Sequence, residues 1–215
     1  MISHLRSLAV LLLAATHALA QPAIEVVSRA PLAVPAAPAQ ATHALRLALA
    51  VLEDTGWTAE AAGRLALEAA GILAQCGIAL ESAEAIRIAA PARYRDFRTP
   101  DSRALAQALP LARPTLYFVA DTRQRPAYDA EAIGRGNSRS RPELADTVWI
   151  TRAARDPGIA LAHELAHVLM DSGEHSDAPG NLMRDETSPG ATRLDDAQCA
   201  RLRGTAERNG LLRRR

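Results

Sequence analysis

The sequence has 215 residues, and its 25 basic residues nearly balance its 24 acidic ones, giving a formal net charge of +1. A charge so close to zero provides no general attraction to nucleic acid or to an anionic membrane, so we expect neither as a partner. Residues 43–215 are long enough for a single domain with a substantial core.

The chain begins with a segment that is typical of a secretory signal peptide. Arg6 precedes a short apolar run over residues 8–15, and Ala18-Leu19-Ala20 resembles a cleavage site. The apolar run is too short for a membrane anchor, which needs about 20 residues. We therefore expect residues 1–20 to be removed and the mature protein to be exported, to the periplasm or outside the cell, with no membrane attachment.

The next segment, residues 21–42, is rich in proline and alanine, which predicts a linker or a mobile N-terminal arm. Apolar residues then alternate over 45–51, the pattern of a β-strand. Thr58 can cap a helix that runs to about Cys76, and Gly77 suits its end.

The middle of the chain predicts short strands separated by loops. We expect strands over residues 85–88 and 115–120, with a small helix over 102–109. Residues 121–142 are polar and rich in glycine and arginine, which predicts mostly loop. A further strand is expected at 147–151.

A well-specified helix follows this strand. Asp156 is a good N-cap, Pro157 suits the first helical position, and Gly173 suits the helix end. The residues between them are apolar on nearly all sides, as in a buried helix. With a final helix expected over 195–208, the order of elements fits an α+β fold.

The buried helix carries an H-E-x-x-H motif at His163, Glu164 and His167. Residues four apart lie on one face of a helix, so the two histidines can bind one metal ion from the same side. Catalytic Zn²⁺ typically takes three protein ligands and activates a water molecule. Glu164 would then be the general base that accepts the proton of this water. The simpler interpretation is an ordinary helix with surface histidines.

A third histidine, His175, follows the helix, and Met183 comes soon after it. Three of the six histidines in the chain thus fall within residues 163–175. Such clustering favours a zinc site formed by His163, His167 and His175.

The segment from His175 to Met183 resembles the third-ligand and Met-turn region of the matrixin group of metzincins. Those enzymes run H-S-x-x-x-x-x-L-M, and here the residues are His175-Ser176-Asp177-Ala178-Pro179-Gly180-Asn181-Leu182-Met183. The resemblance implies a metzincin-like fold over residues 43–215: a twisted mixed sheet with a long packing helix, then a zinc-binding helix, a Met-turn and a C-terminal helix. It also implies that Glu164 is the base and that Met183 lies under the metal.

The sequence departs from the matrixin pattern in the spacing of its histidines. The family has H-x-x-G-x-x-H, whereas here seven residues stand between His167 and His175, and Met170 occupies the glycine position. The helix would then run about one turn longer, and Asp171 and Glu174 become rival third ligands. Only His43 remains outside the cluster and the signal segment, so the additional structural zinc site of many matrixins is not expected.

The resemblance favours an exported zinc endopeptidase, acting as a monomer on peptide or protein substrates. Two alternatives remain open. One is a gluzincin-type peptidase in which a downstream glutamate, with Glu186 as the candidate, is the third ligand. The other is a non-catalytic secreted protein that keeps the zinc fold, although binding alone would not require Glu164.

The chain contains two cysteines, Cys76 and Cys199. An even number of cysteines in an exported protein favours a disulfide, here between the first long helix and the last. The alternative is a pair of buried thiols.

Overall fold

The computed structural model describes residues 23–124 and 127–215, which form a seven-stranded mixed sheet with helices on both faces. The strands are β1 (Glu25–Pro31), β2 (His43–Leu52), β3 (Ile78–Ala89), β4 (Thr115–Phe118), β5 (Ala130–Ile133), β6 (Thr147–Ile150) and β7 (Leu212–Arg214). The helices are α1 (Ala59–Leu73), α2 (Thr99–Ala108), α3 (Pro157–Met170) and α4 (Asp196–Arg208).

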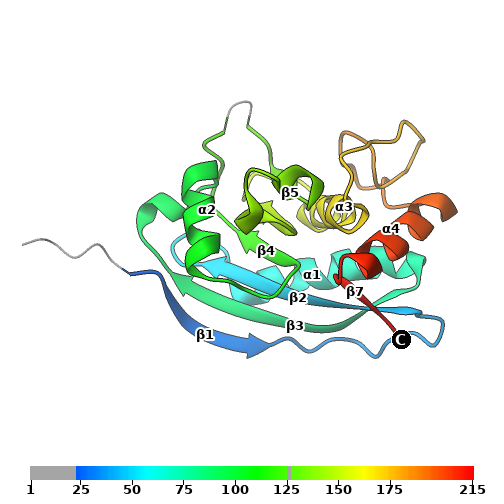
Figure 1. Ribbon diagram of the computed structural model, residues 1–215, viewed down its shortest axis with the longest axis horizontal. Helices are drawn as coiled ribbons and strands as arrows, with labels where there is room; N and C mark the ends of the chain where they lie inside the picture. Colours follow the sequence, from blue (N-terminus) through cyan, green and yellow to red (C-terminus); the bar gives the residue numbers. More distant parts are fainter. Residues whose placement is uncertain (1–22, 125–126) are drawn as a thin grey trace, which may run out of the picture.

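The sheet has a parallel centre and antiparallel edges. Its strand order is β1-β3-β2-β4-β6-β5, and β7 pairs with the start of β2. Strands β3, β2, β4 and β6 run parallel to one another, whereas β1 and β5 are antiparallel to their neighbours. Figure 1 shows β1 and β5 at opposite edges of the sheet. Among the described strands, β5 pairs with β6 alone.

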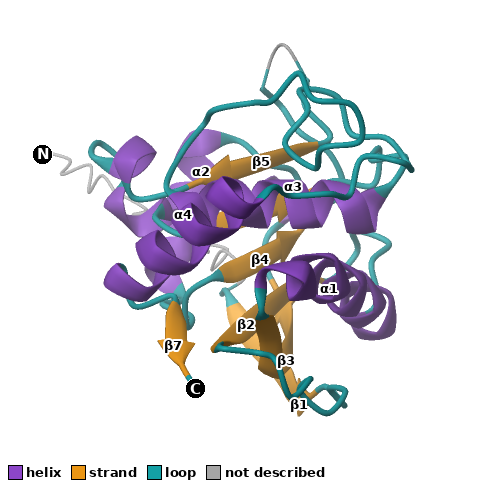
Figure 2. Ribbon diagram, turned by 90° about the vertical axis from the view of Figure 1, so that its right-hand side faces the viewer, coloured by secondary structure: helices purple, strands orange, loops and turns teal. Residues whose placement is uncertain are grey.

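Strand β2 divides the core between the two faces of the sheet. Its alternate residues from Leu45 to Val51 pack in one apolar cluster with α1, α3 and α4. The intervening residues, from Ala48 to Leu52, pack in a second cluster that includes α2. Because successive side chains of a strand point to opposite faces, one continuous apolar run supplies both clusters. Figure 2 shows α1, α3 and α4 beside the sheet.

Most of the predicted elements are confirmed. Thr58 caps α1, where its Oγ1 accepts a hydrogen bond from the Ala61 amide at 3.1 Å, and Gly77 ends the following 3₁₀ turn at a φ of 71°. Helix α4 begins with a capping box between Asp195 and Gln198. The strands expected over residues 45–51, 115–120 and 147–151 correspond to β2, β4 and β6, and the helix expected over 102–109 corresponds to α2.

The prediction of a linker over residues 21–42 is wrong for the segment that forms β1. This strand pairs with β3 from Glu25 to Pro31. Just beyond it, the Leu32 amide donates a hydrogen bond to the Ala83 carbonyl at 2.9 Å. Composition suggested a linker because proline and alanine rarely build strands, but an edge strand needs only one partner and tolerates them. Residues 1–20, expected to be a signal peptide, lie outside the described residues.

Three further strands differ from the predictions. The short strand expected at 85–88 is the end of the twelve-residue strand β3, most of whose sequence lacks simple alternation. Strand β5 lies in the segment expected to be loop, and β7 was not predicted. Both are short edge elements whose pairing with a neighbouring strand, rather than intrinsic propensity, makes them strands.

A disulfide joins Cys76 to Cys199, as predicted. Cys76 follows α1 and Cys199 lies in the first turn of α4, so the bridge connects the two helices across 123 residues of sequence. Within the described part of the chain, no helix has the length and apolarity needed to cross a bilayer.

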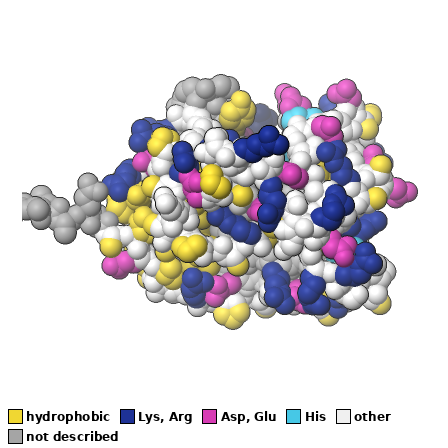
Figure 3. Space-filling view, in the orientation of Figure 1, with side chains coloured by type: hydrophobic (Ala, Val, Ile, Leu, Met, Phe, Trp, Pro, Cys, Tyr) yellow, Lys and Arg dark blue, Asp and Glu magenta, His cyan; other side chains and the backbone are white. Residues whose placement is uncertain are grey.

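Charged side chains of both signs are interspersed on the face of the molecule seen in Figure 3. Many of the surface arginines pair with carboxylates; Arg46 and Arg213, for example, both bind Glu81, and Arg87 binds Glu53. Such exposed pairs contribute little to stability, typically below about 1 kcal/mol each.

Candidate metal centre

Helix α3 brings two histidines into the interior. Pro157 occupies its first turn, and Asp156 is at the N-cap position, although its side chain makes no capping hydrogen bond. The helix is buried on almost every side, which agrees with its apolar sequence. His163 and His167, one turn apart, are only 4% and 8% exposed. Buried polar groups of this kind require partners.

The rings of His163, His167 and His175 converge on one point. The Nε2 atoms of His163 and His167 are 2.9 Å apart, and those of His167 and His175 are 3.2 Å apart. One ring nitrogen from each of the three histidines lies within 4.8 Å of the other two, so the group could hold a metal ion. Two nitrogens bound to one tetrahedral zinc lie about 3.3 Å apart, given Zn–N bonds of about 2.0 Å.

The hydrogen bonds of the rings fix which nitrogen carries the proton. Nδ1 of His163 lies 2.8 Å from the Leu182 carbonyl oxygen, and Nδ1 of His167 lies 2.7 Å from that of Ser172. A carbonyl only accepts, so each Nδ1 donates and each neutral ring leaves a lone pair on Nε2. These two lone pairs face each other without a proton between them. A bound cation would relieve that repulsion, and the donor set fits zinc.

Burial favours the neutral form of both helical histidines. Burial, with the neighbouring His163, lowers the pKa of His167 to about 4, and burial also lowers the pKa of His163. The rings are therefore uncharged at neutral pH. Neutral imidazole is the form that binds metals, so no proton has to be displaced from Nε2.

The chain reverses direction at Asp171, not at Gly173 as predicted. Asp171 ends α3 in the left-handed conformation, with a φ of 47°. The Ser172 amide then donates to the His167 carbonyl at 3.1 Å. The helix therefore ends at Met170, without the extra turn expected from the long spacing, and the added residues form the turn that brings His175 back.

The two rival ligands point elsewhere. Oδ1 of Asp171 accepts a hydrogen bond from the Gly136 amide at 2.6 Å, and Glu174 forms an exposed ion pair with Arg201. Neither carboxylate belongs to the histidine cluster, whereas His175 does.

Met183 is buried beside the histidine cluster at 1% exposure. It lines a small cavity together with His175 and Ser172. The Met183 amide donates to Oδ1 of Asn181 at 2.8 Å, and the Asn181 side chain exchanges two hydrogen bonds with Gln198 on α4. Helix α4 thus holds the segment whose Leu182 carbonyl orients His163.

Glu164 lies between the cluster and the edge strand β5. It lines a cavity of about 490 Å³ that also includes the three histidines and Ala130, Glu131 and Ala132 of β5. Burial and the neighbouring Glu131 raise the pKa of Glu164 to about 8, while a hydrogen bond from the Ala132 backbone opposes the shift. A cation held by the histidines would favour the ionised carboxylate.

A second cavity of about 560 Å³ adjoins the first and shares His163, Glu164 and Tyr128 with it. Asp185 also lines both cavities, and the unshared lining of the second includes Asp156 and Glu186. Glu186, the third ligand of the gluzincin alternative, is exposed, lies outside any helix and is not part of the histidine cluster. The structure therefore does not support that alternative.

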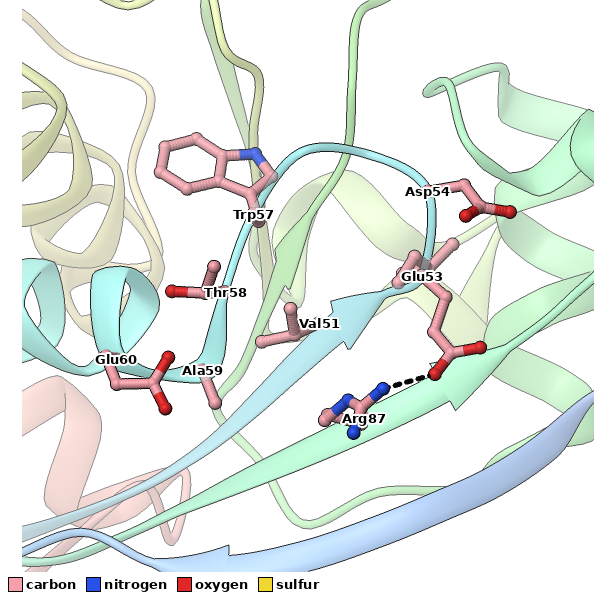
Figure 4. Close-up of a pocket in the computed structure, with 9 residues that line it drawn as sticks. Val51, Glu53, Asp54, Trp57, Thr58, Ala59, Glu60 and Arg87 are labelled. Carbon is pink, nitrogen blue, oxygen red and sulfur yellow. Dashed lines mark hydrogen bonds and ion pairs between the residues drawn. The ribbon is translucent and has the colours of Figure 1, made fainter.

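A third cavity, of about 480 Å³, lies at the end of β2 and the start of α1 (Figure 4). It contains Glu53, Asp54 and Glu60, but Glu53 pairs with Arg87 at 2.5 Å and Asp54 pairs with Arg95 at 2.6 Å. None of its lining residues lines the cavity of the histidine cluster.

No family model and no curated protein sequence matches the chain. Among solved structures, 75 chains match. One is metalloproteinase-II from Bacteroides fragilis, with a TM-score of 0.52, 16% sequence identity and coverage of 78% of this chain. The protein has a metalloproteinase-like α+β fold. It spans about half of that neighbour, since the match covers 54% of the neighbour's chain.

Sequence reasoning missed several groups that build this centre. The carbonyls of Leu182 and Ser172 carry no sequence signal, because any residue has a carbonyl. Glu131 and Tyr128 lie in a segment that was predicted to be mostly loop, so neither was recognised as a cavity residue. Asn181 lies inside the predicted Met-turn segment, but only the position of α4 shows that it binds Gln198.

Proposed function

We propose that the protein is an exported zinc-dependent endopeptidase. The observation that carries the proposal is the convergence of three imidazole Nε2 atoms beside Glu164, at an open cavity bordered by a sheet edge. His163, His167 and His175 are the ligands in this proposal, and Met183 forms the apolar floor next to them. The metalloproteinase-like fold supports the same assignment.

Zinc in this position would act as a Lewis acid and lower the pKa of a water molecule from about 15.7 to about 7. The protein supplies the rest of the chemistry. Glu164 accepts the proton of the attacking water, and the same carboxylate then donates it to the leaving amine. The Ala132 backbone next to Glu164 favours the ionised form of the carboxylate.

The free edge of β5 can align an extended peptide. Ala130, Glu131 and Ala132 border the cavity that contains Glu164, and β5 pairs with β6 on one side only. Apart from the Ala132 backbone, which contacts Glu164, such an edge strand offers backbone groups that a peptide can pair with. A peptide held in this way would cross the histidine cluster, which favours endopeptidase activity.

Export is part of the proposal, and the disulfide is its support. Disulfides persist in oxidising compartments and are rare in the cytosol. The Cys76–Cys199 bridge is therefore consistent with the signal segment expected over residues 1–20.

The decisive experiment combines metal analysis with hydrolysis of a fluorogenic peptide library by residues 21–215. We expect one zinc per chain, cleavage that a chelator abolishes, and recovery on adding zinc. Glu164→Gln should retain zinc, whereas hydrolysis should fall by about 10²–10⁴-fold, because Gln cannot accept the proton.

Glu174→Gln is the matched control, since it removes an exposed carboxylate of the neighbouring segment that pairs with Arg201. It should keep both zinc and activity. A Glu164→Gln protein that cleaves at the wild-type rate would refute the mechanism. Stoichiometric zinc with no cleavage of any peptide by the wild type would instead favour a non-catalytic secreted protein.

A further inference from the structure

Asp171, the residue that ends α3, makes two separate contributions to the structure. Asp171 adopts the left-handed conformation that reverses the chain. This conformation presents the Ser172 carbonyl to Nδ1 of His167, at 2.7 Å. Asp, Asn and Gly all tolerate such a conformation, so the turn alone does not require a carboxylate.

The carboxylate of Asp171 contacts a different part of the chain, residues 134–137, the segment that follows β5. Its Oδ1 accepts the Gly136 amide at 2.6 Å. A Cβ atom added at either Gly134 or Gly136 would lie 3.1 Å from the same oxygen. The two glycines therefore allow the segment to approach Asp171 closely.

Among the described residues of this segment, Arg135 provides a second side-chain anchor, and it does not line the cavity. Arg135 pairs with the buried Asp146 at 3.2 Å and donates to the Asn209 carbonyl at 2.8 Å. Because the Arg135 side chain is itself about half exposed, at 49%, its ion pair alone is a weak constraint. The bond from Gly136 to Asp171 is the contact that joins the segment directly to the end of α3.

Both ends of this segment line the cavity that contains Glu164 and the three histidines. Gly134 and Asn137 line it from one side, and Ser172 and Gly173 line it from the other. Asp171 lies directly before Ser172 and binds Gly136 between the two lining residues. It thus links the two sides of this part of the cavity.

We propose that Asp171 is a positioning residue whose carboxylate fixes the width of the cavity next to His167, and so positions one end of a bound peptide. The inference rests on the proposed peptidase function for its effect on substrate. Its structural part, the attachment of residues 134–137 to α3, can be measured without any substrate.

The test uses two substitutions that preserve the left-handed turn. Asp171→Gly removes the acceptor, whereas Asp171→Asn keeps an oxygen that can accept the Gly136 amide. Hydrogen exchange of the Gly136 amide should accelerate by roughly tenfold or more in Asp171→Gly and stay near wild type in Asp171→Asn. Zinc content and the thermal midpoint establish that both variants are folded and loaded.

Activity is measured on peptides extended from the cleaved bond toward either end. For Asp171→Gly, KM should rise about tenfold for peptides extended toward one end only, while kcat for the shortest cleaved peptide stays within about twofold. Asp171→Asn should restore KM. A merely structural loss would alter both sets of peptides and kcat together.

Asp54→Gly is the matched control. Asp54 is another left-handed aspartate, at a φ of 59°, whose carboxylate binds Arg95 beside the separate cavity of Figure 4. It should change neither Gly136 exchange nor KM. Unchanged exchange of the Gly136 amide and unchanged KM in Asp171→Gly would overturn the inference. So would an Asp171→Asn protein that is as impaired as Asp171→Gly. The same rise in KM in Asp54→Gly would overturn it as well. Absence of hydrolysis by the zinc-loaded wild type would refute the proposed function instead, and the exchange rates would still decide the role of Asp171.

Discussion

The orientation of each helical histidine depends on one backbone carbonyl. Leu182 binds His163 and Ser172 binds His167, each from a segment that follows α3. Contacts of this kind fix the tautomer and the direction of a ligand ring before the metal arrives. The interior therefore holds two oriented candidate ligands on a rigid helix. The third candidate, His175, is more exposed and lies in the irregular segment after α3.

At the scale of single residues, we expect His175→Ala to lose tight zinc binding. The change removes one of three converging nitrogens, so affinity should fall by more than the roughly 10–100-fold that loss of an indirect contact costs. Zinc content by mass spectrometry after dialysis against a weak chelator measures this.

Two control variants separate this effect from general damage. His43 is buried next to Glu207 and lies outside the cluster, so His43→Ala should keep one zinc per chain. Glu186→Gln should do so as well. Stoichiometric, tight zinc in His175→Ala, or its loss in Glu186→Gln, would require a different set of ligands.

At the scale of the elements, helix α1 shows how the N-terminal segment joins the core. Gly63 lies on the buried side of α1, where an added Cβ would lie only 2.1 Å from Cδ2 of Leu32. Leu32 and Val34 pack against the core cluster. The absence of a side chain at Gly63 is therefore what allows the segment after β1 to lie on the helix.

Two glycines of α1 provide a matched test of this packing. Gly71 is exposed, and a Cβ there would meet nothing within 4 Å, so Gly71→Ala should stabilise the protein by about 0.5–1 kcal/mol through helix propensity. Gly63→Ala should leave the stability unchanged or lower it, because Leu32 must move to make room for the added methyl group. Urea unfolding measures both.

A double variant provides the control for this prediction. In a Leu32→Ala background, Gly63→Ala should recover most of the gain seen for Gly71→Ala, since the two sites are coupled. Equal stabilisation by Gly63→Ala and Gly71→Ala in the wild-type background would contradict the packing of Leu32 on α1.

At the scale of the whole molecule, the disulfide joins elements that are far apart in the sequence. The cross-link closes a loop of 123 residues between the end of α1 and the start of α4. Helix α4 in turn holds the Asn181–Met183 segment through Gln198. The bridge therefore stabilises the elements around the histidine cluster as well as the overall fold.

We expect the Cys76→Ala/Cys199→Ala double variant to lose up to about 4–5 kcal/mol of unfolding free energy, the chain-entropy value for so long a loop. Equilibrium urea unfolding measures the loss. Wild-type protein unfolded and refolded with a reductant should show the same midpoint as the double variant. Equal midpoints for oxidised and reduced wild type would contradict a stabilising role.

The sequence by itself determined the long helices and the helical part of the candidate site. Helices α1, α3 and α4 begin at residues of N-cap type and have apolar faces and sufficient length, so local patterns predicted them, although the Asp156 side chain makes no capping bond. His163, Glu164 and His167 share one helix, and their spacing alone predicts their proximity. The clustering of the histidines and the even number of cysteines led to His175 and to the disulfide.

Only the tertiary structure decided which groups complete the site. Strands β1 and β5 have weak intrinsic signals, and they are strands because β3 and β6 offer them a partner. Asp171, Glu174 and His175 are all close enough in sequence to reach His163 and His167. The position of the chain reversal decides that His175, and neither carboxylate, joins the cluster. The ring-orienting carbonyls and the contact between Asp171 and Gly136 join segments whose separation is set by packing, which no local pattern encodes.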